Sequence, residues 1–499
     1  MSWIMKKRFH QIELFLKYPH EVQAEWFDEL IEYGAESEWG KQHEFEKIKS
    51  SDDFKKAVPI QSYETLHPYI EEVMQGKQNI LWPGKIKWFA KSSGTTADKS
   101  KFIPITKESL EECHYKGGKD LISLYYNNQP DSKLFTGKGL VLGGSSNVNK
   151  LNEDSYYGDL SAVIIRNLPF WAEHQRTPSM EVALMDEWEA KLQKMAEITA
   201  KQDITSITGV PSWTLVLLKR VLEITGKNNI AQVWPNLELF AHGGVSFEPY
   251  RKNFKQIFGD LPVSYMETYN ASEGFFGIQN QINNDDQGLL LMLDYGIYYE
   301  FMPMSESGKD NPETLSLHDV EIGRQYALII TTNGGLWRYE IGDTIEFTSL
   351  NPYKIKITGR TKHFINAFGE ELIIDNAEKA LSKACELSGA VIKDYTAAPV
   401  YMSDNETGGH EWAVEFEKLP EDKTYFTEVL DQELKACNSD YEAKRYKNFV
   451  LKQPLIHFLP VGTFYNWMKK RGKLGGQNKV PRLSNNRKYL EDVLESCAN

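Results

Sequence analysis

Hydrophobic positions follow two periods along this chain, and each period predicts a different element. Between residues 21 and 33, Val22, Trp26, Leu30 and Ile31 recur at helical spacing with acidic residues between them. This pattern predicts an amphipathic helix whose apolar side packs on a core.

The segment from about residue 107 to 225 alternates helical patterns with short β-branched runs, which is typical of an α/β layer. Residues 161–165 are one such run, and residues 204–211 predict a buried strand that ends in a turn. Ser212 stands where the N-cap of the following helix is expected.

Three further strand-like runs occupy residues 239–244, 263–274 and 298–303, and the first two end in glycine or polar residues. Open α/β sheets bind ligands at the carboxyl ends of their strands, so we expect these runs to form successive walls of one pocket. Residues 326–332 and 336–345 then predict a hairpin through an Asn-Gly-Gly turn.

The end of the chain predicts a smaller α+β unit. Its first helix is marked by a capping box of Asp375 with Glu378 and by an apolar stripe. The stripe residues, and the alternating residues of a later strand, are Ala377, Ala380, Leu381 and Ala384, and Trp412, Val414 and Phe416.

The sequence therefore predicts an α/β fold class with two domains, a large N-terminal α/β domain and a small, mobile C-terminal α+β domain. We place the boundary at Gly359, with domains at 1–358 and 359–499 and a hinge near 353–361, because glycine beside a long charged residue suits a hinge.

Composition narrows the class of protein. A chain of 499 residues exceeds one compact core, and its 41% hydrophobic content is that of a globular protein. The net charge of -13 argues against nucleic-acid binding. No apolar run approaches the ~18 residues of a membrane span and no signal-peptide core follows the N-terminus, so we expect a cytoplasmic protein without membrane contact, as a monomer or weak oligomer.

Several common chemistries lack their signature here. The four cysteines lie far apart without Cys-x-x-Cys, which indicates neither a disulfide framework nor a zinc knuckle. Gly-x4-Gly-Lys-Ser/Thr, Gly-x-Gly-x-x-Gly, Gly-x-Ser-x-Gly and His-Glu-x-x-His do not occur. Their absence argues against a P-loop NTPase, a dinucleotide dehydrogenase, an α/β-hydrolase and a zincin.

A hydroxyl-rich loop follows the β-like run at residues 86–90. It consists of Ser92, Ser93, Gly94, Thr95 and Thr96. Small side chains let backbone N–H groups approach a polyphosphate, and Lys99 or Lys101 supplies positive charge, so the stretch predicts an ATP-binding loop. Taken alone, it is also compatible with a Ser/Thr-rich surface turn.

Two acidic residues supply what ATP binding needs besides a phosphate loop. Glu273, directly after Ser272 at the end of a strand, is a candidate ligand for Mg²⁺, which takes oxygen ligands and usually one or two protein carboxylates. Asp343, after Gly342, can accept hydrogen bonds from both ribose hydroxyls. Either acid by itself is more often solvated or capping.

Eight Lys and Arg but no Asp or Glu lie between Lys469 and Lys488. In an acidic protein, such a run predicts either an anionic partner or a solvated tail.

The order of these motifs resembles the acyl-adenylate-forming superfamily, which includes acyl-CoA ligases and luciferases. Within it, the chain is most similar to the auxin-responsive Gretchen Hagen family of acyl acid amido synthetases, from about residue 21 to 490. The superfamily motifs are Ser-Ser-Gly-Thr-Thr with Lys101, residues 269–273, residues 337–343 and Gly359-Arg360; residues 54–59, 69–70, 298–303, 320–326 and 478–482 carry the narrower resemblance. Ala97, where glycine is common, and the basic stretch 472–477 depart from the pattern.

The resemblance implies a large domain of luciferase-like type with a mobile cap, and a two-step reaction. ATP and Mg²⁺ first convert a carboxylic acid to an acyl-adenylate, and an amine, typically an amino acid, then takes the acyl group. Lys479 is implied to contact the α-phosphate, Arg360 to lie at the pivot, and Tyr269 with Gly244 to bind the nucleotide. No general base for the amine is identified.

The acyl pocket is expected between residues 120 and 245. Its candidates are Tyr125, Trp171 and Trp213, with His242 and Gly243 in the turn that faces adenine and the acyl group, although aromatic residues are ordinary core material and a histidine is more often structural. The sequence does not identify the acid. An acyl-CoA ligase and a nucleotide-binding protein without catalysis are the alternatives.

Overall fold

In a computed structural model of the protein, the chain forms two compact units. The first comprises Met1–Val245 and Phe254–Ile357, and the second Ser246–Asn253 and Thr358–Asn499. The structure describes residues 2–92, 101–142, 148–168, 170–185, 187–244, 247, 250–282, 288–360, 364–365, 370, 372–400, 408–438, 441–442, 445, 451–474, 479–484 and 487–498.

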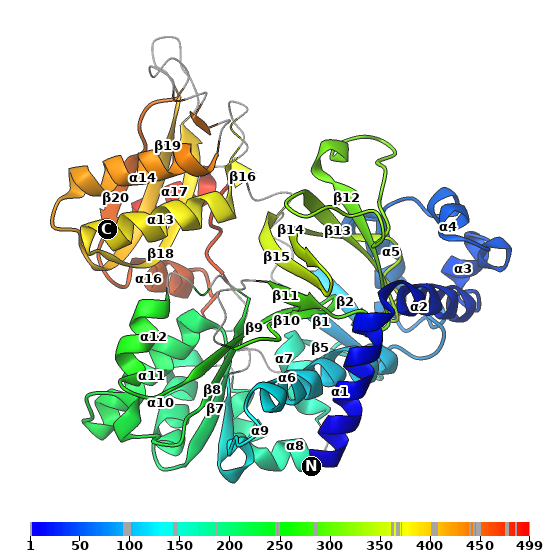
Figure 1. Cartoon of the computed structure of the whole chain (residues 1–499), viewed down its shortest axis with the longest axis horizontal. Helices are drawn as coiled ribbons and strands as arrows, with labels where there is room; N and C mark the ends of the chain where they lie inside the picture. Colours follow the sequence, from blue (N-terminus) through cyan, green and yellow to red (C-terminus); the bar gives the residue numbers. More distant parts are fainter. Residues whose placement is uncertain are drawn as a thin grey trace. The chain divides into compact units, whose positions relative to one another are not determined.

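An 11-stranded sheet forms the framework of the first unit (Figure 1). Its strands, in spatial order, are β12 (Ile297–Pro303), β13 (Gln325–Thr332), β14 (Tyr339–Leu350), β15 (Tyr353–Arg360), β11 (Leu289–Leu291), β10 (Gly274–Ile278), β9 (Ser264–Ala271), β8 (Leu239–Gly243), β7 (Ile204–Gly209), β3 (Lys138–Val141) and β6 (Arg176–Thr177).

The direction of the strands changes at β9. From β6 through β3, β7 and β8 to β9, each neighbouring pair is parallel. The pairs of β9 with β10, β10 with β11, and β11 with β15 are antiparallel, as are those of β14 with β13 and β13 with β12. The parallel half brings its carboxyl ends to one edge, where α/β sheets bind ligands.

Helices and a smaller sheet complete the first unit. The small sheet has the order β2 (Lys101–Ile105), β1 (Trp88–Ser92), β5 (Tyr156–Gly158) and β4 (Asn149–Lys150). The helices are α1 (Ser2–Lys17), α2 (Pro19–Gly34), α3 (Glu38–Gln42), α4 (Ser51–Ala57), α5 (Tyr63–Met74), the π-helical turn Ser109–His114, α6 (Tyr115–Asn128), α7 (Leu160–Arg166), α8 (Phe170–Gln175), α9 (Met180–Ala183), α10 (Trp188–Thr199), α11 (Pro211–Thr225) and most of α12 (Arg251–Phe258).

The N-terminal helices are tied to the sheet by polar side chains as well as by apolar packing. The predicted helix at 21–33 is confirmed as α2, and its buried face includes Gln23, which the apolar pattern does not mark. The Gln23 amide donates to the carbonyls of Leu293 and Ile297, each at 2.9 Å, and accepts from the Tyr299 N–H. It thereby satisfies backbone groups at the edge strand β12.

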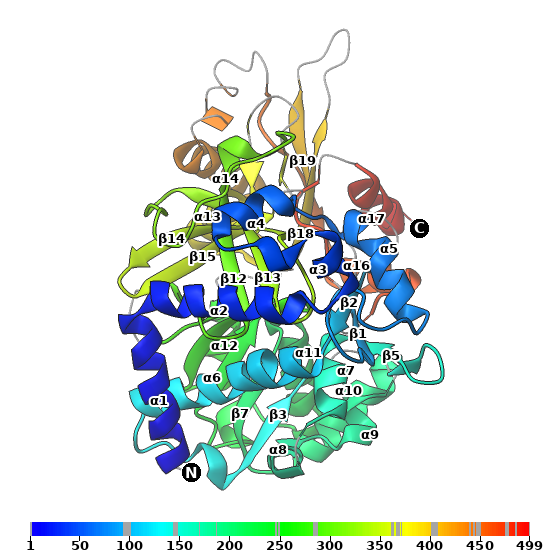
Figure 2. The same cartoon turned by 90° about the vertical axis from the view of Figure 1, so that its right-hand side faces the viewer.

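A buried ion network joins α1 to α6, which lie side by side in Figure 2. The Arg8 guanidinium contacts the carboxylates of Asp120 at 2.6 Å and Asp294 at 2.8 Å. Tyr295 also donates to Asp120, at 2.6 Å. Burial of charge is tolerated here because each carboxylate has a charged or hydroxyl donor.

Two local predictions in the first unit are wrong. Residues 161–165 lie in helix α7 instead of a strand. The buried residues of this helix are Leu160, Ala162, Val163 and Ile165, which follow a helical spacing. The β-branched residues of the run conceal that spacing in the sequence. Ser212 is not the N-cap of α11. That helix begins at Pro211 after Val210, since the fixed φ of proline suits the first helical position.

The strands predicted at 204–211, 239–244, 263–274 and 298–303 are confirmed as β7, β8, β9 and β12, and the hairpin as β13 and β14.

The second unit is built on a three-stranded sheet. Its elements are β16 (Phe364–Ile365), β17 (Leu372–Ile373), α13 (Ile374–Ser388), β18 (Val391–Val400), β19 (Gly409–Lys418), α14 (Lys423–Cys437), β20 (Leu455–Leu459), α16 (Thr463–Lys470) and α17 (Lys488–Ala498). The sheet order is β18-β19-β20, and α13 packs beside α14 (Figure 1). The predicted α+β character of this part is confirmed.

The predicted capping box at the start of α13 is wrong, although the apolar stripe is buried as expected. Helix α13 begins at Ile374, so Asp375 lies inside its first turn and pairs with Lys379 at 2.7 Å. The N-terminal contact is made instead by Asn376, whose amide oxygen accepts from the Ile373 N–H at 3.3 Å.

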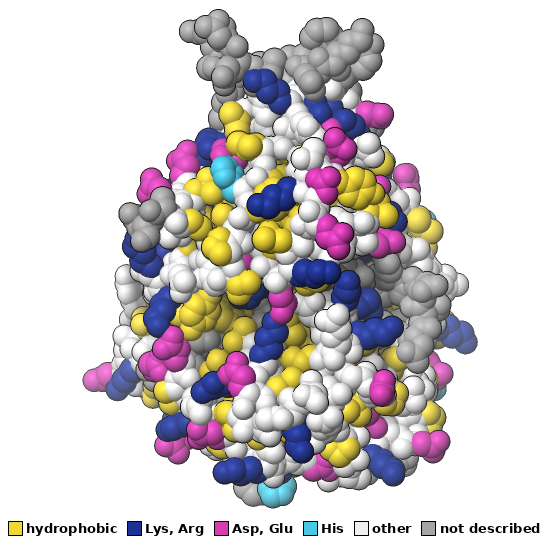
Figure 3. All heavy atoms as spheres, turned by 90° about the vertical axis from the view of Figure 1, so that its left-hand side faces the viewer, with side chains coloured by type: hydrophobic (Ala, Val, Ile, Leu, Met, Phe, Trp, Pro, Cys, Tyr) yellow, Lys and Arg dark blue, Asp and Glu magenta, His cyan; other side chains and the backbone are white. Residues whose placement is uncertain are grey.

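Acidic and basic side chains are interspersed over the face shown in Figure 3. Within the described ranges, no helix has the length and apolarity that crossing a bilayer requires.

Candidate active site

The predicted phosphate loop connects two paired strands of the small sheet. Strands β1 and β2 are antiparallel, with Ser92 opposite Lys101. Ser93, Gly94, Thr95 and Thr96 lie outside the described residues, and of Ser92 only the backbone is described. Paired residues of antiparallel strands stand about 5 Å apart, so the stem holds both ends of the loop together.

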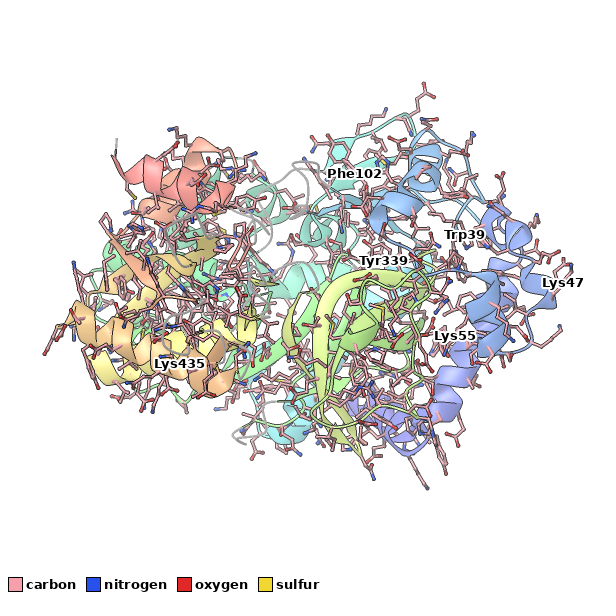
Figure 4. The ribbon with its side chains drawn as sticks, turned by 90° about the horizontal axis from the view of Figure 1, so that it is seen from above. Trp39, Lys47, Lys55, Phe102, Tyr339 and Lys435 are labelled. Atoms are coloured by element: carbon pink, nitrogen blue, oxygen red, sulfur yellow. The ribbon has the colours of Figure 1, made fainter. Side chains whose placement is uncertain are left out.

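Tyr63 stabilises the end of this stem. The Lys101 ammonium lies over the Tyr63 ring at 5.4 Å from its centroid, and the Tyr63 hydroxyl accepts from the Phe102 N–H at 2.8 Å. Lys101 is therefore placed where the loop ends. Phe102 is labelled in Figure 4.

A glycine turn ends strand β8 at the carboxyl edge of the parallel sheet. Gly243 is opposite Thr268 of β9, and a Cβ atom on Gly243 would stand 2.4 Å from the Thr268 carbonyl oxygen. Gly244 has φ +82, a conformation that other residues adopt only with strain. His242, buried before this turn, accepts on its carbonyl from the Thr268 hydroxyl at 3.2 Å.

The structure brings Tyr269 of β9 and Asp343 of β14 into direct contact. The Tyr269 hydroxyl donates to the Asp343 carboxylate at 2.6 Å. Three strands separate β9 from β14 in the sheet order, which in a flat sheet would place them about 19 Å apart. The sheet must therefore curl strongly, and this curl makes the two residues neighbours.

A bulge in β14 aims Asp343. Ala327 of β13 is opposite Thr344, and Ile329 is opposite Glu340, so three residues of β14 face a single residue between these pairs. Gly342, inside the bulge, has φ +88. Bulges of this kind redirect a side chain without breaking the sheet.

Ser272 and Glu273 form the two-residue turn between β9 and β10, because Ala271 pairs with Gly274 across it. Ser272 is 4% exposed and its hydroxyl has no hydrogen-bond partner in the described part of the chain. Buried hydroxyls normally have partners, so this one suits an oxygen of a bound ligand. Glu273, next to it, is half-buried.

These residues fit a nucleotide with one magnesium ion. The described ranges contain no group of three or more His, Cys, Asp or Glu that could hold a metal ion by protein ligands alone. A single carboxylate such as Glu273, together with phosphate oxygens and water, is the arrangement that Mg²⁺ commonly adopts at nucleotides.

The predicted acyl-pocket residues do not all reach this edge. The Tyr125 hydroxyl donates to the carbonyl of Glu238 at 3.3 Å, directly before β8 begins, and burial raises the pKa of Tyr125 to about 12. Tyr125 therefore lies at the amino ends of the strands. Trp213 lies in the first turn of α11, which follows the carboxyl end of β7, and for Trp171 only the backbone, in α8, is described.

Arg360 and Lys479, which the sequence predicts at the pivot and at the α-phosphate, belong to the second unit. Arg360 ends β15, and its side chain lies outside what the structure describes. Lys479 is exposed and directly precedes the buried Val480.

Arg338 of the Trp-Arg-Tyr-Glu-Ile-Gly-Asp motif has a structural position that the motif alone does not reveal. Its guanidinium pairs with Glu300 at 2.9 Å and donates to the Val58 carbonyl at 2.7 Å, and both ionic side chains are at most 5% exposed. Arg338 also has φ +43, next to the strand that carries Asp343. Lys55 and Tyr339, labelled in Figure 4, lie beside this network, and the Lys55 carbonyl accepts from Arg338 at 3.1 Å.

His114 is a second residue that sequence reasoning missed. It ends a π-helical turn, is buried, and forms a side-chain hydrogen bond with Asn270, the residue after Tyr269. Burial lowers the pKa of His114 to about 4, so the imidazole is neutral at pH 7. No local pattern marks it, although π-helical turns are frequent at functional sites.

A missed segment also follows the carboxyl end of β3. Residues 143–147 read Gly-Gly-Ser-Ser-Asn, a glycine and hydroxyl combination similar to that of the phosphate loop, and they lie outside the described residues.

Family comparison accounts for this combination of residues. Models of the GH3 family N-terminal, central and C-terminal domains match residues 8–263, 290–360 and 375–488. The chain belongs to the GH3 family. The sequence-based assignment to this family is thereby confirmed.

Several GH3 proteins are similar over most of their length. The 4-substituted benzoates-glutamate ligase GH3.12 of Arabidopsis thaliana is 24% identical, over 95% of this chain and 94% of that protein. The indole-3-acetic acid-amido synthetase GH3.4 of the same plant is 23% identical, over 94% and 90%. The jasmonoyl-L-amino acid synthetase JAR4 of Nicotiana attenuata is 24% identical, over 77% and 76%.

Solved structures agree on the fold. A GH3.15 acyl acid amido synthetase superposes with a TM-score of 0.80 at 18% identity, covering 97% of this chain and 95% of that one. A 2-hydroxyisobutyryl-CoA ligase has a TM-score of 0.61 at 12% identity, covering 96% and 91%. The predicted α/β fold of the acyl-adenylate-forming type is confirmed.

Proposed function

We propose that this protein is an ATP-dependent acyl acid amido synthetase. It adenylates a small carboxylic acid, releasing pyrophosphate, and then transfers the acyl group to an amine, an amino acid in the simplest case. The enzyme class predicted from the sequence, an acid-amino acid ligase, is confirmed by the GH3 membership and by the names of the relatives.

The observation that carries this function is the contact between Tyr269 and Asp343 beside the Gly243-Gly244 turn. In the proposal, Asp343 accepts from the ribose hydroxyls, and Tyr269 orients that carboxylate and lines the adenine side. Gly243 and Gly244 leave space for the base, and His242 supports their turn. Trp213 contributes to the acyl pocket.

The chemistry requires a carboxylate to attack a polyanion, so positive charge must offset the repulsion. We assign the phosphates to residues 92–96 and Lys101, and Mg²⁺ to Glu273 beside the Ser272 hydroxyl. Lys479 brings its ammonium to the α-phosphate in the first step, and Arg360 lies at the pivot of a cap at 359–499. The division between the two compact units at Ile357 and Thr358 supports this boundary. We further propose a cytoplasmic monomer or weak oligomer.

The test is a reaction with ATP, Mg²⁺, a panel of carboxylic acids and the common amino acids, read out as AMP and amide. At least one pair is expected to form both products. Coenzyme A in place of amino acids tests for thioester formation instead. ATP binding without pyrophosphate exchange for any acid would contradict the proposal and favour a nucleotide-binding protein without catalysis.

A further inference from the structure

The segment that follows Lys479 is attached to the sheet of the second unit. The Ala397 N–H of β18 donates to the Arg482 carbonyl at 2.8 Å, and the Ser484 N–H donates to the Ala397 carbonyl at 3.1 Å. The Thr396 hydroxyl donates to the Pro481 carbonyl at 2.6 Å. The backbone at residues 481–484 is thus held beside β18, where Leu483 forms an isolated parallel bridge with Ala397.

Burial adds to this attachment. Val480 is 5% exposed and Leu483 is 0% exposed, and Leu483 belongs to the apolar core of the second unit. Lys479 itself is exposed. An exposed lysine therefore stands directly before this attached segment.

Arg482 is the polar anchor of that segment. Its guanidinium pairs with the Asp394 carboxylate, donates to the Tyr395 carbonyl at 3.3 Å and lies over the Tyr395 ring at 4.6 Å from the centroid. It also donates to the hydroxyl of Tyr250, which belongs to the same unit, at 3.4 Å. The side chains of Arg482 and Asp394 are only 15% and 20% exposed, so this contact is shielded from solvent.

Arg482 lies three positions after Lys479, a span of at most about 10 Å in extended chain. Because the chain is hydrogen-bonded to β18 at Pro481, Arg482 and Ser484, a shift at Arg482 moves a segment that begins two positions after Lys479. Catalytic groups are sensitive to such shifts, since a displacement of about 1 Å can change a rate about hundredfold.

We propose that Arg482, held by Asp394 and Tyr395, is the positioning residue that sets where Lys479 presents its ammonium during adenylate formation. The inference rests on the proposed function. Its specific consequence is that Arg482 matters for the first half-reaction and much less for the second.

The experiment measures the two half-reactions separately on the full chain, with an acid accepted by the wild-type protein. Pyrophosphate exchange reports adenylate formation, and amide formation from a synthetic acyl-adenylate reports the second step. Arg482→Met is expected to slow exchange by about tenfold to hundredfold and to leave amide formation near the wild-type rate. Arg482→Lys keeps the charge and should recover part of the exchange rate.

Arg487→Met is the matched control. Arg487 also forms an ion pair in the second unit, with Glu411 at 2.6 Å, and donates to the Pro399 carbonyl of β18 at 2.9 Å. It lies eight positions after Lys479 in the sequence, whereas Arg482 lies three positions after it. Its loss should leave both half-reactions near the wild-type rates.

Asp394→Asn keeps Arg482 and changes no volume, so it reports on the anchor if Arg482→Met fails to fold. Exchange at the wild-type rate in both variants, or an equal loss of both half-reactions, would overturn the inference alone. A wild-type protein that exchanges no pyrophosphate with any acid would instead overturn the proposed function, and this inference with it.

Discussion

The hydroxyl of Tyr269 and the carboxylate of Asp343 are 2.6 Å apart, although 74 residues separate them in sequence. The pair exists because the sheet curls and because a bulge turns Asp343 toward β9. It combines an aromatic surface with an oriented carboxylate, and the proposed nucleotide site depends on this combination.

Tyr269→Phe should raise the KM for ATP by about tenfold, because a hydrogen bond to a charged group is worth about 1.5 kcal/mol or more. Steady-state kinetics in ATP measure this. Tyr299→Phe is the control, since Tyr299 donates to the Met292 carbonyl at 3.0 Å in the core. The control should lose stability while its KM for ATP stays unchanged, and a KM shift of the same size in both would argue against a nucleotide role for Tyr269.

Gly243→Ala should sharply reduce ATP binding and thermal stability, because its Cβ would meet the Thr268 carbonyl oxygen at 2.4 Å and force β8 from β9. Gly118→Ala is the matched control, on α6, where an added Cβ meets nothing within 4 Å. That variant should gain about 0.5–1 kcal/mol, as alanine does over glycine in an exposed helix. Calorimetry on both variants measures ATP binding and thermal stability. A stable Gly243→Ala variant that binds ATP would contradict the close approach of Gly243 to the Thr268 carbonyl.

Glu300→Gln should lower the free energy of unfolding by about 3–5 kcal/mol, the usual result of leaving one partner of a buried ion pair uncompensated. Its partner Arg338 has a side chain that is 5% exposed. Denaturant titration measures the change. Glu386→Gln removes the exposed pair with Lys383 and should have almost no effect. Similar values for the two variants would show that the Arg338 network contributes little.

Acid sensitivity should depend on His114. Burial lowers its pKa to about 4 from the ordinary value of 6.5, so the unfolded chain takes up this proton first as the pH falls. Stability is therefore complete above pH 6.5 and is lost as the pH falls toward 4, by about 3 kcal/mol in total. His114→Gln should be less destabilised between pH 7.5 and 4.5 than wild type. An equal loss of unfolding free energy in the two proteins would mean that protonation of His114 does not cause the acid sensitivity.

Lys479→Ala should slow pyrophosphate exchange by about 10² to 10³, the usual loss for one donor to a transition state. Lys473→Ala, in the same basic run, should leave the rate nearly unchanged. If Lys473→Ala slows pyrophosphate exchange and Lys479→Ala does not, the proposed role at the α-phosphate belongs to Lys473.

Local patterns were sufficient wherever one segment carries its own signal. The strand at 204–209 and the helix at 19–34 follow from periodicity, because burial on one side imposes a spacing that the sequence must show. Periodicity failed at residues 161–165 and at the start of α13, where β-branched content and an acidic pair imitate other elements.

The sequence by itself determined the order of the motifs, the α/β class and the family to which the chain belongs. Only the tertiary structure decided that Tyr269 contacts Asp343, that Tyr125 lies at the opposite ends of the strands, and that Arg338 pairs with Glu300. These relationships depend on the curl and register of a sheet assembled from distant segments. No single segment encodes that curl, because it arises from how all the strands pack together.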